Sequence, residues 1–218
     1  MCRLIGYASR EPREIAPYLT CLSILAQRGN PDGWGISYRS GDKTRIIRQV
    51  QSAEDDELIG TLKAKADRLI GHVRMATDKR TVNASNSHPF HVDGITLAHN
   101  GMFRGAIGAE ADRRKVSDSL VFLEVLAERW TERTTDGLRE ALLSIVNNDD
   151  LVGEFSGANL IIGYGNSLYA FRCFRTSENY YSLFVRETEN MATVSSVCLN
   201  ESPEWRLLAN KELVDLTR

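Results

Sequence analysis

The fold and the chemistry of this chain both depend on its opening stretch, Met1-Cys2-Arg3-Leu4-Ile5-Gly6-Tyr7-Ala8. Removal of Met1 would leave Cys2 with a thiol and a free α-amine on the same carbon. Such an amine has a pKa of about 7.7–8.0, so near neutral pH it can take the thiol proton directly or through a water. A second interpretation is a cysteine packed in an edge strand, because free cysteine is among the most buried residue types. The position of Cys2 alone favours the packing interpretation, so evidence that Cys2 is catalytic has to come from the rest of the chain.

Size and composition indicate one globular domain over residues 1–218. Hydrophobic residues make up 42% and charged residues 26%, and the net charge of −2 gives no electrostatic footprint for nucleic acid or an anionic membrane. No apolar run reaches the length of a membrane span, and no secretory signal is present, so we expect a cytoplasmic protein. The four cysteines are widely spaced and are expected to be free thiols.

Hydrophobic periodicity predicts strands towards both ends of the chain, with helices between them. A polar loop over residues 77–94 is long enough to favour a functional role. This order predicts an α+β architecture in which stacked sheets are covered by helices. Helices are predicted over 14–27, 53–66, 117–129 and 136–146, and strands over 2–8, 34–38, 45–50, 68–76, 95–99, 158–164, 168–175, 181–186 and 191–197.

Four local patterns combine turn residues with residues that carry chemistry. In the pattern at residues 71–77, strand alternation places His72 and Arg74 on one face of the sheet. The others contain a glycine turn or lie in the long polar loop. The patterns are Pro31-Asp32-Gly33-Trp34-Gly35-Ile36, Gly71-His72-Val73-Arg74-Met75-Ala76-Thr77, Asn86-Ser87-His88-Pro89-Phe90 and Ala98-His99-Asn100-Gly101-Met102.

Together with the opening Met-Cys and the later Ser117-Asp118-Ser119, these patterns resemble the class II glutamine amidotransferases, and in particular their stand-alone members. The resemblance extends from Cys2 to about Leu123 and is weaker in the closing strands. It implies a four-layer αββα sandwich of the N-terminal-nucleophile hydrolase type. It also implies hydrolysis of the side-chain amide of glutamine, or of a γ-glutamyl amide, through a thioester, with no cofactor.

The resemblance assigns roles to individual residues. Cys2 would attack the amide carbon, and the Asn100 side chain and the Gly101 N–H would form the oxyanion hole; out of context, Asn-Gly is a simple hairpin turn. Arg74 would pair with the substrate α-carboxylate. The alternative role for Arg74 is a surface salt bridge. Asp118 would hold the α-ammonium, although a carboxylate at a helix start is also favoured by the helix dipole. Thr77 is expected beside Arg74.

All four histidines lie within residues 72–99, so a metal site has to be weighed. Their spacing fits no common zinc pattern, and we expect no metal. His99 is placed with the substrate-binding residues, and both His72 and His99 are expected to be hydrogen-bonded near the site. His91 is expected to be an exposed loop residue. Gly33 and Trp34 are expected to shape the turn near the nucleophile, with Trp34 equally well explained as core.

Two departures from the family pattern are visible. Members fused to a synthase often carry Trp and His where this chain has Met75 and Asp78, and stand-alone relatives often have Ser-Glu-Pro-Leu near residues 195–199.

Three functions remain open at this point. The chain would release ammonia from glutamine for a separate synthase subunit, hydrolyse a larger γ-glutamyl compound, or serve as a catalytically silent binding module of the same fold.

Overall fold

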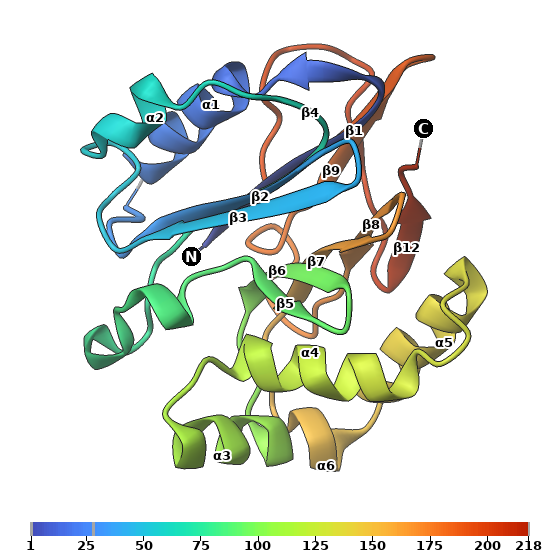
Figure 1. Cartoon of the computed structure of the whole chain (residues 1–218). Coiled ribbons are helices and arrows are strands. Elements are labelled where there is room, and N and C mark those ends of the chain that lie inside the picture. The colour runs from blue at the N-terminus through green and yellow to red at the C-terminus, as the bar shows by residue number, and fades with distance from the viewer. Residues whose placement is uncertain (1, 28, 218) are drawn as a thin grey trace.

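Two antiparallel sheets stacked face to face form the middle of the molecule (Figure 1). The computed structural model describes residues 2–27 and 29–217. The first sheet has seven strands in the order β11-β9-β10-β1-β4-β2-β3, and the second has five in the order β12-β8-β7-β6-β5. The first comprises β1 (Arg3–Glu14), β2 (Trp34–Ser40), β3 (Lys43–Gln49), β4 (Lys65–Val73), β9 (Phe184–Glu187), β10 (Met191–Ser195) and β11 (Arg206–Leu207); the second comprises β5 (Phe90–Val92), β6 (Ile95–Gly101), β7 (Ala158–Tyr164), β8 (Ser167–Arg172) and β12 (Glu212–Asp215).

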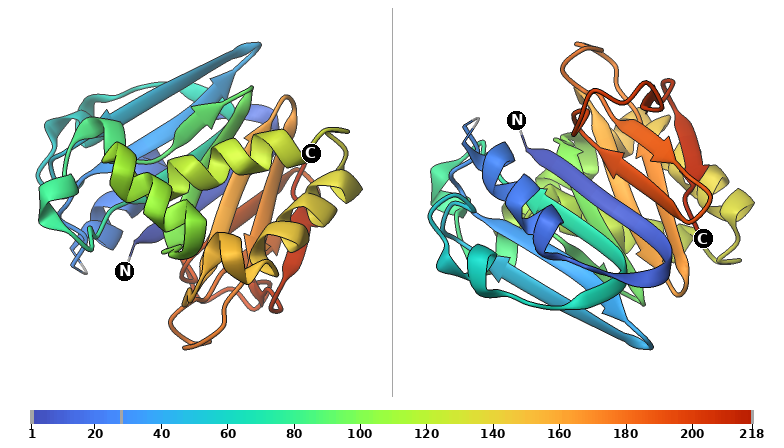
Figure 2. Two further views of the ribbon diagram at one scale, coloured as in Figure 1. Left: turned by 90° about the horizontal axis from the view of Figure 1, so that it is seen from below. Right: turned by 90° about the horizontal axis from the view of Figure 1, so that it is seen from above.

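Helices cover the outer face of each sheet, as the two views of Figure 2 show. The first sheet carries α1 (Ala16–Ala26) and α2 (Glu57–Thr61), and the second carries α3 (Gly105–Arg114), α4 (Asp118–Arg129), α5 (Thr135–Val146) and α6 (Asp149–Val152). The four-layer αββα class predicted from the resemblance is therefore confirmed. Among the described residues, no helix has the length and apolar character needed to cross a lipid bilayer.

The hydrophobic core divides into three clusters, which match the three interfaces between the four layers. One cluster lies between the first sheet and α1, another between the two sheets, and the largest between the second sheet and its helices. Representative members are Leu19, Leu22 and Trp34 for the first; Leu4, Ile70, Ala98 and Ile161 for the second; Phe122, Leu126, Ile145 and Leu160 for the third. This stacking fixes the position of the strand ends that carry the predicted site.

The strand that follows Cys2 occupies an interior position in the first sheet. β1 pairs with β10 on one side and with β4 on the other, and Leu4 lies opposite His72. Leu4 also exchanges backbone contacts with Ser196, whose hydroxyl accepts a hydrogen bond from the Leu4 N–H at 2.9 Å. Cys2 therefore does not lie in an edge strand, which excludes the interpretation that it is a cysteine packed in such a strand.

The clearest predicted helix, α4, begins where its sequence indicates. The Ser117 hydroxyl accepts a hydrogen bond from the Ser119 N–H, and Asp118 lies in the first turn, where a carboxylate is stabilised by the helix dipole. The buried side chains Phe122, Leu123 and Leu126 then face the second sheet. The N-cap places Asp118 at the end of the helix that points towards β6.

Several predicted boundaries are wrong for tertiary reasons. The helix expected over 53–66 is only α2, because Lys65 and Ala66 already pair with β1. The helix expected from residue 14 starts at Ala16, since β1 continues to Glu14. Local patterns predicted none of α3, α6, β5, β11 and β12. Cross-strand pairing decides these segments more strongly than local propensity does.

Candidate active site

The thiol of Cys2 lies against the backbone of Met75, which follows the end of β4. The Met75 N–H donates a hydrogen bond to the Cys2 Sγ at 3.4 Å, and the same sulfur lies 3.6 Å from the Met75 carbonyl oxygen. Burial raises the pKa of the Cys2 thiol, and the contact with Met75 counteracts this only in part. A thiol with a raised pKa is protonated near neutral pH and needs a base before it can attack. Met1, whose removal would supply that base, lies outside the described residues.

Arg74 is the residue between the end of β4 and Met75, and its side chain is buried. Its backbone N–H donates to the Gly33 carbonyl at 2.8 Å. Its guanidinium donates from Nη1 to the Thr81 carbonyl at 3.0 Å and from Nη2 to the Thr81 hydroxyl at 2.9 Å. Arg74 thus lies just past the strand that was expected to contain it. Hydrogen bonds hold both its backbone and its guanidinium, and its positive charge lowers the pKa of the neighbouring Cys2 thiol.

The turn at Asp32 and Gly33 fastens the segment that follows β4. The buried Asp32 carboxylate accepts a hydrogen bond from the Ala76 N–H at 2.8 Å and pairs with the Lys79 ammonium at 2.6 Å. Gly33 has a φ of +113°, and a Cβ there would lie 2.4 Å from the Gln49 carbonyl oxygen. This position therefore requires glycine, and the turn fixes the backbone on which Arg74 stands.

Asn100 and Gly101 end β6, the strand of the second sheet that faces Cys2's end of β1 and β4. Asn100 is buried and lies opposite Asn159 of β7. A Cβ on Gly101 would lie only 1.8 Å from the Gly157 carbonyl oxygen, so no side chain fits at this position. The two residues therefore sit on a backbone that neighbouring strands hold closely, as an oxyanion hole requires.

Asp118 uses both carboxylate oxygens to organise the backbone around it. Its Oδ1 accepts a hydrogen bond from the Ser119 N–H at 2.9 Å, and its Oδ2 accepts one from the Phe103 N–H at 2.7 Å. The helix-start role is therefore real, and the second contact ties α4 to the loop after Gly101. The negative charge of Asp118 also acts on Cys2 through space and raises the pKa of its thiol.

One open cavity of about 490 Å³ brings together two separate parts of the sequence, within residues 74–81 and 101–118. Of the predicted site residues, the lining includes Arg74, Thr77, Gly101 and Asp118. Cys2, Asn100 and His99 do not line it: Cys2 contacts Met75, which follows Arg74; Asn100 precedes Gly101; and His99 hydrogen-bonds with Ser119, which follows Asp118. The cavity thus carries a buried cation and a carboxylate near a thiol.

Three buried histidines pack behind this cavity. The rings of His72 and His88 lie 4.2 Å apart, and those of His88 and His99 lie 6.4 Å apart. His99 Nδ1 hydrogen-bonds with the Ser119 hydroxyl at 2.8 Å. Burial, reinforced by the charge of Arg74, lowers the pKa of His72 to about 3, and burial also lowers the pKa of His88 and of His99. The cluster is therefore neutral at pH 7 and serves as packing between the strands.

Some residue-level expectations need correction. His72 was expected to be hydrogen-bonded; among the described residues neither ring nitrogen has a partner of normal geometry, although the backbone of His99 acts on its pKa. His91 is exposed as expected but lies in β5, where its Nδ1 contacts the Thr96 hydroxyl. Thr77 lines the cavity, but the threonine that contacts Arg74 is Thr81. Trp34 is core, with its Nε1 donating to Asp56 at 2.9 Å.

Asp32, Thr81 and Asn86 support the site without having been assigned any part in it. The buried Asn86 accepts a hydrogen bond from the Ser117 N–H at 3.0 Å, which joins the long polar loop to the start of α4. Asp32 and Asn86 belong to patterns that were recognised, so their motifs were the available signal. For Thr81 the sequence offers no comparable signal.

Comparison with known proteins places this geometry in context. The family model described as "Glutamine amidotransferases class-II" matches residues 1–187. Glutamine--fructose-6-phosphate aminotransferase [isomerizing] of Agrobacterium fabrum is 27% identical over 188 residues, covering 76% of this chain and 30% of the relative. The chain therefore spans about a third of the length of this curated relative.

Solved structures show the same fold at lower identity. A glutamine aminotransferase class-II domain protein from Silicibacter pomeroyi superposes with a TM-score of 0.67 at 17% identity, covering 99% of this chain and 95% of the other. Glutamine phosphoribosylpyrophosphate amidotransferase from B. subtilis gives a TM-score of 0.65 at 18% identity, covering 99% of this chain and 47% of the other. At these identities the likeness is one of fold.

Proposed function

Because this chain belongs to the class-II glutamine amidotransferase family, we propose that it hydrolyses the side-chain amide of glutamine or of a γ-glutamyl amide, with Cys2 as nucleophile. The observation that carries the proposal is the cavity in which Arg74, Gly101 and Asp118 meet beside the Cys2 thiol. A cation and a carboxylate flanking one cavity match the two charges of an amino acid head. The Cys2 thiol near that cavity supplies the reactive atom.

The reaction begins with transfer of the Cys2 thiol proton to a base. The thiol pKa is raised by burial, so this step requires a group such as the α-amine that Cys2 has once Met1 is absent. The thiolate attacks the amide carbon, and the carbonyl oxygen becomes an oxyanion. The Asn100 side-chain N–H and the Gly101 backbone N–H donate to that oxyanion, where loss of one donor typically costs about 10²–10³-fold in rate.

Collapse of the tetrahedral intermediate breaks the carbon–nitrogen bond. The proton taken from Cys2 passes to the leaving nitrogen, which departs as ammonia or an amine, and a thioester with Cys2 remains. Water then attacks the thioester carbon, the sulfur leaves, and glutamate is released with the thiol restored. Throughout, Arg74 binds the α-carboxylate and Asp118 the α-ammonium. Thr77 lies on the lining beside them, and His99 supports Ser119 next to Asp118.

The released nitrogen would have one of two fates. Ammonia would pass to a separate synthase subunit, as the aminotransferase relatives suggest. A larger amine is favoured by a second cavity of about 490 Å³, which shares Met102 and Arg104 with the first and is also lined by Ser156. Ser156 adjoins Gly157, whose carbonyl packs against Gly101, so this second cavity begins beside the reacting amide. A silent binding module would retain the cavity without the reaction.

Intact mass before and after incubation with an electrophilic diazo-ketone analogue of glutamine tests the nucleophile. We expect loss of Met1 and a single adduct, formed with release of dinitrogen. Cys2→Ala should give no adduct and no glutamate from glutamine. Cys198→Ala is the matched control, because Cys198 is an exposed thiol, and it should be labelled like the unchanged chain. Full labelling of the Cys2→Ala variant would overturn the assignment.

Comparison of substrates tests the fate of the nitrogen. Among the described residues, the exposed Arg104 side chain has no ion pair, so it is available to an anionic leaving group. If the second cavity holds the amine, γ-glutamylglycine should have a higher kcat/KM than neutral γ-glutamyl methylamide. Arg104→Gln should remove that preference, about tenfold or more, while sparing glutamine. A strict requirement for glutamine would favour delivery of ammonia to a partner subunit.

A further inference from the structure

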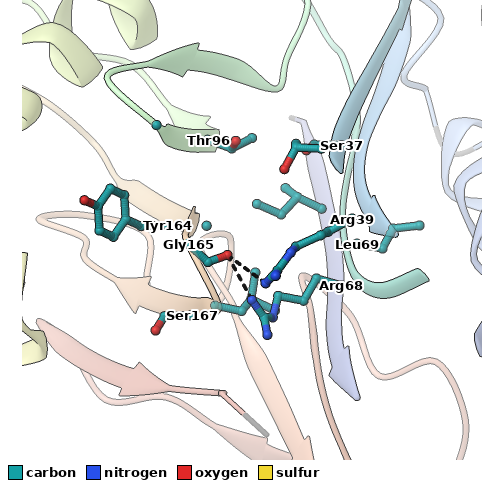
Figure 3. A pocket seen from close by; sticks show the side chains of 13 residues that line it. Ser37, Arg39, Arg68, Leu69, Thr96, Tyr164, Gly165 and Ser167 are labelled. Atoms are coloured by element: carbon teal, nitrogen blue, oxygen red, sulfur yellow. Dashed lines mark hydrogen bonds between the residues drawn. The ribbon is translucent and has the colours of Figure 1, made fainter. Parts of the chain in front are cut away.

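A second basic site lies between the two sheets, away from the candidate active site (Figure 3). Arg39 of β2 and Arg68 of β4 reach from the first sheet towards the Gly165 turn of the second sheet, which joins β7 to β8. Arg68 precedes Arg74 by six residues along β4, which corresponds to about 20 Å at the usual rise of a strand. The cavity is therefore distinct from the one beside Cys2.

The two arginines form a like-charge pair. Arg39 and Arg68 are directly opposite each other in the antiparallel pairing of β2 and β4, an arrangement that destabilises a sheet when both residues carry the same charge. Both guanidinium groups donate to the same Gly165 carbonyl oxygen, at 3.1 Å and 3.0 Å. Figure 3 shows them side by side at that oxygen. One shared carbonyl cannot neutralise two positive charges.

Nearby groups compensate these charges only in part. Arg39 also donates to the Asn166 side chain and lies 3.7 Å from the fully exposed Asp42, a contact that water screens strongly. Among the described residues, the buried Nε of Arg68 has no hydrogen-bond partner. Asp67 and Asp215 act on Arg68 through space, whereas burial and the charge of Arg39 both lower its pKa.

The remaining lining suits an oxygen-rich anion. None of the described residues that line the cavity is acidic, and the lining includes the hydroxyl-bearing residues Ser37, Thr44, Thr96 and Ser167. Its volume is about 40 Å³, on a scale where one water needs about 10–15 Å³, so it holds a few water-sized groups and no extended metabolite. Guanidinium groups bind carboxylate and phosphate through paired hydrogen bonds.

We propose that this cavity binds a small oxyanion, a phosphate or a carboxylate group, between Arg39 and Arg68. The anion would accept hydrogen bonds from both guanidinium groups and would reduce the repulsion between them. Because the arginines belong to one sheet and the Gly165 turn to the other, the bound anion would also join the two sheets. This site does not depend on the proposed amidase activity.

Thermal unfolding of the full chain at constant ionic strength tests the site. Sodium phosphate and sodium acetate are each titrated against sodium chloride as the reference salt. Binding to the folded state alone raises the thermal midpoint. We expect phosphate, acetate or both to raise it by about 2–4 °C, the size of shift typical of modest stabilisation in a chain of this length. The more effective anion identifies whether the site takes phosphate or carboxylate.

Variants assign the effect to the arginine pair. Arg39→Gln and Arg68→Gln should each abolish the oxyanion-dependent rise, and Arg68→Lys should weaken it, since lysine lacks the fork. Arg45→Gln is the matched control, because Arg45 is an exposed arginine of β3 in the same sheet, and it should keep the full rise. A rise as large in chloride, no rise with either oxyanion, or a full rise in Arg68→Gln would overturn the proposal.

Discussion

Lowering the pH should destabilise this protein through its buried histidines, and His72 allows the effect to be calculated. Burial lowers the pKa of His72 from the ordinary 6.5 to about 3. Between those values the unfolded chain binds a proton that the folded chain does not, so the contribution is fully present above pH 6.5 and is lost as the pH falls towards 3. The slope is about 1.36 kcal/mol per pH unit. Acidification from about pH 6.5 to about pH 4.5 should therefore cost roughly 2.5 kcal/mol at this residue.

Urea unfolding at about pH 7 and about pH 4.5 measures this loss. His72→Leu removes the titrating ring at little cost in hydrogen bonding, because among the described residues neither ring nitrogen has a partner of normal geometry. The variant should lose roughly 2.5 kcal/mol less than the unchanged chain over the same interval. His91→Gln is the comparison: partial burial and the charge of Arg48 also lower the pKa of His91, but its side chain is exposed, so this variant should relieve a smaller part of the loss than His72→Leu. An equal loss in the unchanged chain and in His72→Leu would refute the reasoning.

Three further predictions concern the active site. Arg74→Lys should raise KM for glutamine about tenfold or more, because a point charge replaces a bidentate fork; steady-state kinetics would contradict this with an unchanged KM. Asp118→Asn should reduce activity on glutamine far more than on its des-amino analogue, whereas equal losses would leave only the helix-start role. Gly101→Ala should lower kcat by at least about 10²-fold, since its Cβ would meet the Gly157 carbonyl oxygen at 1.8 Å. Gly60→Ala, with open space around its Cβ, is the control and should retain full activity.

The parts of the site that sequence reasoning predicted are those set by short motifs. Asn100 and Gly101 end a strand, and Asp118 follows a serine N-cap, as their neighbours indicated. These positions depend on a few consecutive residues, so local patterns carry the information. Arg74 lies one residue past the end of β4, the strand expected to contain it, yet it is near Cys2 because β4 pairs with β1.

The parts that were missed depend on contacts between distant segments. Thr81 contacts Arg74 only because the loop after β4 folds back, and that path is fixed by Asp32, which lies 47 residues from Lys79 in sequence. The helix expected over 53–66 failed for the same reason, since the pairing of Lys65 with Glu14 turns its end into a strand. A periodic pattern cannot reveal which remote strand will claim a segment.

The interior position of β1 also has a consequence for the order of events during synthesis. β1 is hydrogen-bonded to β10, and the Ser196 hydroxyl that receives the Leu4 N–H lies 192 residues further along the chain. Contacts of such long range form slowly, and while the chain is still on the ribosome their partner has not yet been made. We therefore expect the segment that carries Cys2 to remain unsettled until nearly the whole chain has been translated. An incomplete chain would then hold its thiol without the surroundings that form the candidate active site, so that site would be assembled only in a nearly finished molecule.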